Sequence, residues 1–387
     1  MPSQILHTLF GEDVVTEIYR GLGPRLGIAA GKALEKIQGV YRTAFVLGCQ
    51  GPDIFYHSQM TRPVGLEYGT LLHRRGAGIF TAGLLKMGLP DLPPDEEDIC
   101  RGRWDKGISA LGVYALGFMT HAILDRQAHP YIVYKSVRVS PANAETYRSA
   151  RLHAFFERIL DVCMLEHLRG ENAADWDQEG LLAEVCGNPP AGLKDLLVRA
   201  LILAFPERAG KDDKLRIRMD NVFADCARFY RETAPRRTAI AAARALPSPA
   251  LLAYVYPEKL SGQQVPAHNS AGWIDFLNLK NAPWFYPAGD SREDRRSFPE
   301  VYAGAVEAAS QAIAPVIAGY LETGSFPIRE AAQAIGNGGL SIRDADGRPC
   351  APTRSDPLPL EKVLEEQEKL RQDAASRTLQ SLAGVQN

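Results

Sequence analysis

Residues 117–131 read GFMTHAILDRQAHPY, and the polar residues in this stretch recur at a fixed interval. His121, Asp125 and His129 stand four residues apart, which places them one above another on one face of an α-helix. The residues between them are mostly apolar, so the helix is expected to lie in the core. The sequence therefore predicts a buried helix that carries a row of imidazole and carboxylate groups.

A second stretch repeats the pattern about twenty residues further on. Residues 150–161 read ARLHAFFERILD, and His153 and Glu157 are again four residues apart. Helical bundles build metal sites from neighbouring helices that point imidazole and carboxylate groups inward. Nitrogen and oxygen ligands of this kind suit zinc, and a carboxylate can bridge two ions.

A simpler interpretation of either helix alone is an ordinary core histidine with a hydrogen-bond partner. The two helices together argue against it. The chain has only eight histidines, and three of them fall on these helices, each helix also carrying a carboxylate. Burial of so many polar groups is costly unless something binds them. The pair of helices therefore favours a metal site.

The order of these residues resembles that of the zinc-dependent phospholipase C family, whose fold is shared with the single-strand-specific fungal zinc nucleases. In that family an N-terminal histidine is followed by an aspartate in a turn, a histidine on the next helix, H-x-x-x-D, a further histidine, and H-x-x-x-E or H-x-x-x-D. The matching positions here are His7, Asp53 in GCQGPDIFYH, His73 in LLHRRGAGIF, His121, Asp125, His129, His153 and Glu157. The likeness covers about residues 1–170.

This resemblance implies two or three bound Zn²⁺ ions. The first would be held by Asp53, His73, His121 and Asp125, the second by His129, His153 and Glu157, and Asp125 would bridge toward a third near His7. In secreted members of the family the third ion is also bound by the amine and carbonyl of a processed N-terminal tryptophan. This chain begins Met-Pro, with six residues before His7. Water or another residue would therefore complete the third site.

Apolar residues recur mostly at three- and four-residue spacing, which predicts an all-α protein. We expect a multi-helix domain of the zinc-dependent phospholipase C and zinc nuclease type over residues 1–325, with the metal site between core helices. Residues 326–387 are expected to be a C-terminal extension with a charged helix from about Pro357. The predicted helices are 12–36 (broken near GLGPRLG), 67–87, 106–129, 144–169, 192–205, 213–244 and 298–323.

Three further expectations concern chain breaks. Pro130 is expected to end the helix that carries His129, because a proline disfavours the α conformation in the residue before it. The stretch 88–98, GLPDLPPDEED, is expected to be an exposed connection. Residues 257–297 are rich in Pro, Gly, Asn and aromatic residues without periodicity, which predicts a long ordered loop.

Composition restricts the cellular setting. The formal net charge of -2 gives no basic surface for nucleic acid or an anionic membrane. The N-terminus has no secretory signal, and no apolar run is long enough to span a bilayer, the best being 110–125. A cytoplasmic protein without a transmembrane segment is therefore expected. No C-x-x-C pair occurs, so reduced core thiols are expected at Cys49, Cys100, Cys163, Cys186, Cys226 and Cys350.

The implied function is zinc-dependent hydrolysis of a phosphodiester. Two zinc ions a few ångströms apart activate a water and hold the attacking and leaving oxygens of an in-line displacement. A phospholipid or lipid-like ester is the favoured substrate because of the family resemblance, and Asp53 is either a ligand or the general base. Two alternatives stay open, a nuclease of the same fold and a non-catalytic metal-binding scaffold protein. The acidic charge balance argues mildly against the nuclease, and the number of ligands argues against a purely structural, four-ligand site.

Overall fold

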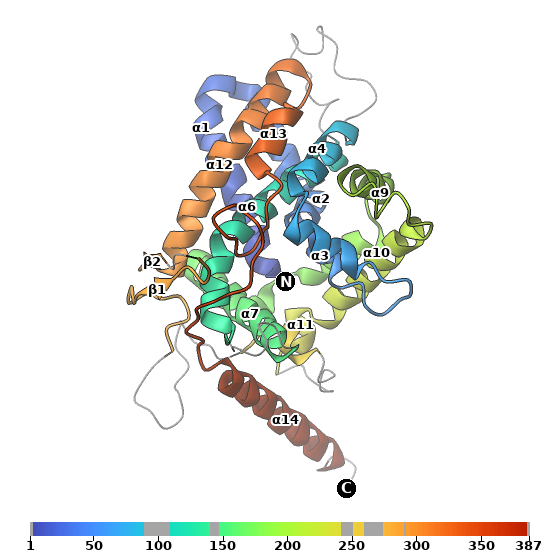
Figure 1. The fold of residues 1–387 in the computed structure, drawn as a ribbon. Helices are drawn as coiled ribbons and strands as arrows, with labels where there is room; N and C mark the ends of the chain where they lie inside the picture. The colour runs from blue at the N-terminus through green and yellow to red at the C-terminus, as the bar shows by residue number, and fades with distance from the viewer. Residues whose placement is uncertain are drawn as a thin grey trace.

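The computed structural model describes residues 3–88, 109–139, 147–240, 251–258, 274–289 and 292–384. It is 67% helix and 2% strand, which confirms the all-α prediction (Figure 1). The finer prediction of a zinc-dependent phospholipase C or nuclease fold stays a prediction.

The elements follow one another along the chain with short connections. The helices are α1 (Gln4–Gln38), α2 (Arg42–Cys49), α3 (Leu66–Arg74), α4 (Ala77–Met87), α6 (Ala110–Ser136), α7 (Tyr147–Arg169), α8 (Glu184–Gly187), α9 (Leu193–Ala204), α10 (Leu215–Glu232), α11 (Pro235–Thr238), α12 (Phe298–Thr323), α13 (Ile328–Ile335) and α14 (Leu360–Gly384). Single helical turns are η1 (Gly51–Phe55), η3 (Ala173–Asp175), η4 (Glu179–Ala183) and η5 (Leu252–Tyr254). Strand β1 (Trp284–Phe285) pairs antiparallel with β2 (Glu293–Asp294).

Helix α6 is the central element of the core. From Gly112 to Ser136 nearly every residue is buried, as expected of a helix that neighbours surround on all sides. It packs against α1, α2, α4, α7 and α12. In Figure 1 it lies between α1 and α12 on one side and α2 to α4 on the other. A helix so enclosed can carry polar side chains only if other elements bring partners to them.

Two glycines allow α2 to approach α6 at backbone contact. A Cβ atom on Gly117 would lie 2.4 Å from the carbonyl oxygen of Phe45, and one on Gly48 would lie 2.2 Å from the carbonyl oxygen of Tyr114. Real Cβ atoms do not come that close, so only glycine fits at the crossing. The sequence analysis did not predict α2, which is short and almost entirely buried.

The predicted effect of proline on two helices is wrong. Helix α6 continues through Pro130 to Ser136, and α1 is continuous through the GLGPRLG stretch. The residues beyond Pro130 are held by the core, since Tyr131 is fully buried and its hydroxyl donates to the carbonyl of Phe276 at 2.8 Å. Tertiary packing here outweighs the hydrogen bond and the conformational freedom that a proline removes.

Other predicted bounds hold in part. The 298–323 helix is confirmed as α12, whereas 67–87 is two helices, α3 and α4, and α10 ends at Glu232 before Pro235. The predicted loop 257–297 contains the β1–β2 hairpin in its described part, and α13 was not predicted. The charged C-terminal helix is confirmed as α14. The predicted connection 88–98 lies outside the described residues after Gly88.

The described residues of the C-terminal part pack on the rest of the molecule. Helix α13 lies on α4, and α14 contributes Leu360, Val363 and Leu364 to the same core as α6 and α7. The division of the chain at residue 325 stays a prediction.

Helix α12 is long and apolar enough to cross a membrane by length and composition, unlike the shorter run that the sequence analysis considered. Its buried face, which includes Ile313, Val316 and Ile317, packs on α1 and α6, as in the core helix of a globular fold. Of the predicted core thiols, Cys49, Cys163, Cys186 and Cys226 are buried and free, Cys350 is free and half-buried, and Cys100 lies outside the described residues.

Candidate metal centre

The row of side chains on α6 forms the middle of a polar cluster. The Oδ2 atom of Asp125 lies 3.3 Å from Nε2 of His121 and 3.6 Å from Nδ1 of His129. All three residues are buried. The helical spacing therefore brings the three groups together, as the sequence predicts.

Helix α7 adds the second predicted pair. Nε2 of His153 lies 3.3 Å from Oε1 of Glu157, and Nε2 of His129 lies 3.5 Å from the same oxygen. The rings of His129 and His153 are stacked, with centroids 5.6 Å apart. Glu157 is buried and His153 is half-buried, so this end of the cluster is the more open one.

Helix α1 brings His7 to the opposite oxygen of Asp125. Nε2 of His7 lies 3.3 Å from Oδ1 of Asp125, and its ring stacks on that of His121 with centroids 4.1 Å apart. The start of α1 is fixed by Asp161 of α7, which accepts hydrogen bonds from the hydroxyl of Ser3 and from the backbone N–H of Leu6 at 2.8 Å. A carboxylate at a helix N-terminus satisfies free N–H groups and opposes the helix dipole.

Asp53 and His73 complete the cluster from η1 and α3. Nε2 of His73 lies 3.0 Å from Oδ1 of Asp53 and 3.5 Å from Oδ2 of Asp125. The turn that carries Asp53 begins at Gly51, which has φ 53° and would place a Cβ 2.3 Å from the ring of His121. Only glycine allows the turn to lie against that ring.

Backbone carbonyl groups orient three of the imidazoles. The Nδ1 atoms of His73, His121 and His129 lie 2.8, 3.0 and 3.1 Å from the carbonyl oxygens of Gly69, Cys49 and Asp125. A carbonyl can only accept, so each Nδ1 carries the proton and each neutral ring presents the lone pair of Nε2 to the carboxylates. Metal-ligating histidines commonly have this outer hydrogen bond.

Ser136 plays the same part for His153. Its hydroxyl donates to the carbonyl of Ile132 at 2.6 Å, and its oxygen lies 3.2 Å from Nδ1 of His153. The hydroxyl proton is therefore engaged, and the oxygen is left to accept the Nδ1 proton. The Nε2 lone pair of His153 then faces Glu157.

The ligand atoms form three groups, each within 4.8 Å, that could hold a metal ion. They are His7, His121 and Asp125; Asp53, His73 and His121; and His129, His153 and Glu157. The Nε2 atoms of His73 and His121 and the Oδ2 atom of Asp125 are buried, and within the described residues none makes a hydrogen bond of good geometry. Burial without such bonds is costly unless a bound ion compensates.

The electrostatics of the cluster favour anionic carboxylates. Burial alone would raise the pKa of Asp125, but the positive charges of His129 and His121 hold it well below its usual value. Burial opposes ionisation of Glu157 too, and the charges around it, including those of His153 and His129, lower its pKa to about 2. Both side chains therefore have the ionised form that metal ligation needs.

The structure brings all eight predicted site residues into this cluster. Sequence reasoning missed three residues that support it, namely Asp161, Ser136 and Tyr56, whose ring centroid lies 4.8 Å from that of His73. Asp161 had a visible signal, since it follows Glu157 by four residues on the same helix face. The other two had none.

Comparisons of the chain with family models, with curated proteins and with solved structures give no match. The relation to the zinc-dependent phospholipase C family therefore stays a resemblance of motifs.

Proposed function

We propose that the protein is a zinc-dependent phosphodiester hydrolase of the phospholipase C type. The observation that carries the proposal is the convergence of five imidazoles and three carboxylates, from five separate elements, on one buried site. A single structural ion would need only four ligands. The surplus supports a centre with more than one ion and with positions left for a substrate.

The spacing of the ligand atoms supports zinc. Zinc binds imidazole nitrogen and carboxylate oxygen at about 2.0–2.2 Å in tetrahedral geometry, so two ligands of one ion lie about 3.3–3.5 Å apart. Most of the nitrogen–oxygen separations around Asp125 and Glu157 are 3.3–3.6 Å. A direct N–H···O hydrogen bond is shorter, about 2.7–3.2 Å.

Zinc ions held there would supply the positive charge that activates a water molecule and neutralises the oxygens of a phosphoryl group. The chain's own residues would do the rest. Asp125 would compensate the charge of two ions at once, because its two oxygens face His7 on one side and His73 and His121 on the other. Asp53, on a turn rather than a long helix, would orient the attacking water and accept its proton.

The acidic overall charge is compatible with an anionic substrate, because bound ions would supply the positive charge locally. The preference for a phospholipid or lipid-like diester follows from the motif resemblance alone.

Metal content and turnover test this proposal together. Purified protein is expected to contain at least two zinc ions per chain by mass spectrometry and to hydrolyse a chromogenic phosphodiester. Removal of zinc with a chelator should abolish turnover, and added zinc should restore it. One ion or none after reconstitution would sink the metal assignment, and two ions without turnover of diesters would sink the enzymatic one.

Asp125→Asn is the sharpest variant, because it keeps the side-chain shape and removes the charge shared by the ligand groups. We expect loss of zinc, loss of activity and a lower melting temperature, since a ligand that binds the folded state stabilises it. The matched control is Asp220→Asn, which removes an exposed carboxylate of α10. An Asp125→Asn protein with the metal content and melting temperature of the control would show that Asp125 is an ordinary buried carboxylate.

A further inference from the structure

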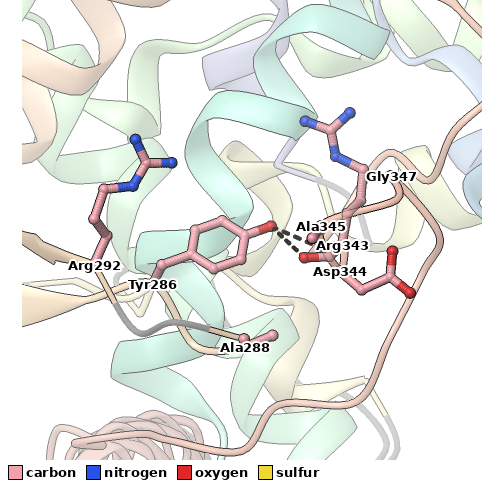
Figure 2. Close-up of a pocket in the computed structure, with 8 residues that line it drawn as sticks. Tyr286, Ala288, Arg292, Arg343, Asp344, Ala345 and Gly347 are labelled. Atoms are coloured by element: carbon pink, nitrogen blue, oxygen red, sulfur yellow. Dashed lines mark hydrogen bonds between the residues drawn. The ribbon is translucent and has the colours of Figure 1, made fainter.

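A cavity of about 580 Å³ lies between the β1–β2 hairpin and the loop that follows α13. The hairpin contributes Tyr286 and Arg292 to its lining, and the loop contributes Arg343, Asp344 and Gly347 (Figure 2). None of these residues belongs to the metal centre. The cavity is therefore a second, separate candidate site.

The walls of this cavity are held in place by hydrogen bonds. The hydroxyl of Tyr286 accepts from the backbone N–H of Arg343 at 2.8 Å and donates to the carbonyl of the same residue at 3.1 Å. The carbonyl of Pro287 accepts from the backbone N–H groups of Thr353 and Arg354 at 2.7 and 3.1 Å. Hairpin and loop are thus tied together, and the cavity between them is preformed.

Arg292 and Arg343 give the cavity positive charge. Figure 2 shows the Tyr286 ring between their side chains, with both guanidinium groups on the same side of the ring. Within the described part of the chain neither guanidinium enters an ion pair, although those of Arg295 and Arg348 nearby do. Their charge is left without a counter-ion in a protein whose net charge is -2.

The one carboxylate of the lining is engaged in its own turn. Oδ1 of Asp344 accepts the backbone N–H groups of Asp346 and Arg348 at 3.0 and 2.8 Å. Figure 2 shows its carboxylate turned away from the two guanidinium groups. Asp344 therefore leaves the guanidinium donors of Arg292 and Arg343 available.

Two further arginines add positive charge around the same loop. Arg126 of α6 directs its donors to backbone carbonyls, including those of Gly338 and Gly339 at 3.3 and 3.2 Å. The guanidinium carbon of Arg354 lies 3.3 Å from the centroid of the Phe285 ring. Like charges gathered without neutralising carboxylates repel one another, and a bound anion would remove that repulsion.

We propose that this cavity is an anion site, which takes the phosphate group of a phosphorylated ligand between Arg292 and Arg343, with the rest of the ligand over the ring of Tyr286. Guanidinium groups bind phosphate through pairs of parallel N–H donors. Two of them match the three terminal oxygens of a phosphate better than the two of a carboxylate. The inference goes beyond the proposed hydrolase function, because it uses no residue of the metal centre.

Calorimetric titration of the full chain with inorganic phosphate and with glycerol phosphate tests the site. Arg292→Gln/Arg343→Gln is expected to weaken binding about tenfold or more, the scale of a lost charge-assisted contact. The control Arg295→Gln/Arg348→Gln changes the same two segments and the same net charge, and should bind like the wild type. Equal binding by the two double variants would overturn the proposal.

A second arm separates this site from the metal centre. Phosphate binding that depends on Arg292 and Arg343 should persist in the Asp125→Asn background. Binding that disappears with zinc and ignores the arginines would refute the site, whatever the fate of the hydrolase proposal.

A third arm identifies the source of the phosphate. Retention on phosphatidylcholine vesicles only when they contain phosphatidate, and only with both arginines intact, would assign the site to a lipid headgroup. Binding of glycerol phosphate without vesicle retention would assign it to a soluble phosphorylated ligand.

Discussion

His73 shows how two carboxylates change the chemistry of one buried imidazole. Burial alone lowers its pKa, but hydrogen bonds to Asp125 and Asp53 outweigh burial and raise the pKa to about 9. In the metal-free protein the ring is therefore protonated at pH 7. Since the folded pKa lies above the ordinary value of about 6.5, this proton stabilises the metal-free fold below about pH 6.5, and the contribution disappears as the pH rises through about 9.

Zinc loading should therefore release a proton from His73, because only the neutral ring binds a metal. Calorimetry of zinc binding in buffers of different ionisation enthalpy measures the number of protons released. We expect this number to fall by about one between pH 7 and pH 10. A number that is independent of pH over this range would contradict the raised pKa.

Asp53 differs from the other carboxylates because it lies on a turn next to Gly51 rather than on a long helix. We predict that Asp53→Asn retains at least two zinc ions and loses activity roughly a hundredfold or more, the scale of a lost general base. The measurement is the phosphodiesterase rate at matched zinc occupancy. An unchanged rate would exclude Asp53 as the base, and a loss of zinc below two ions would make it a ligand first.

At the scale of elements, the site depends on how closely α2 approaches α6. The carbonyl of Cys49, the last residue of α2, orients His121. Gly117 lies where the two backbones meet, one helical turn before His121, so its missing side chain decides how far that carbonyl lies from the imidazole.

Gly117→Ala sets two effects against each other. Alanine favours a helix interior by up to about 1 kcal/mol relative to glycine. The clash with the carbonyl of Phe45 costs more, roughly 1–3 kcal/mol for a shift of packed backbone. We expect lower stability and weaker zinc retention.

Gly21→Ala is the matched control, because the same change in α1 meets no atom within 4 Å. It should leave zinc content unchanged and raise stability slightly. Equal effects of the two variants in urea denaturation would show that the α2–α6 contact tolerates a side chain.

At the scale of the whole molecule, residues far apart in the chain enclose the centre. The segment after α13 lies against α3 and α4, where Leu340 donates its backbone N–H to the carbonyl of His73 at 2.8 Å and Gly78 donates to that of Gly336 at the same distance. Arg126, next to Asp125 in sequence, donates to the carbonyls of Ile335 and Gly339. The C-terminal segment therefore holds both the His73 and the Asp125 sides of the site.

Arg126→Ala should release this segment. Several carbonyls would lose their donor, at about 1–3 kcal/mol for each buried group left unsatisfied. We expect a melting temperature lower by several degrees and a reduced zinc content at the His73 side. Arg138→Ala, which removes an exposed arginine just after α6, should change neither. Equal melting temperatures would show that the segment does not depend on Arg126.

The candidate site could be predicted from the sequence because each half of it is local. The i, i+4 spacing of His121, Asp125 and His129 fixes their common face through helix geometry alone. His7, Asp53 and His73 carry no such local signal, and only the order of motifs pointed to them. Asp161, whose carboxylate fixes the start of α1, acts across a long chain separation and was missed.

The sequence by itself determined the helical class, the ligands and their chemical type, because periodicity and residue type are properties of short segments. The tertiary structure alone decided that α6 runs on past Pro130, that Gly117 and Gly48 let α2 touch it, and that the segment at Leu340 contacts His73. These features depend on the free energy of packing between segments distant in the chain. No local propensity contains that term, and at Pro130 it reverses the local preference.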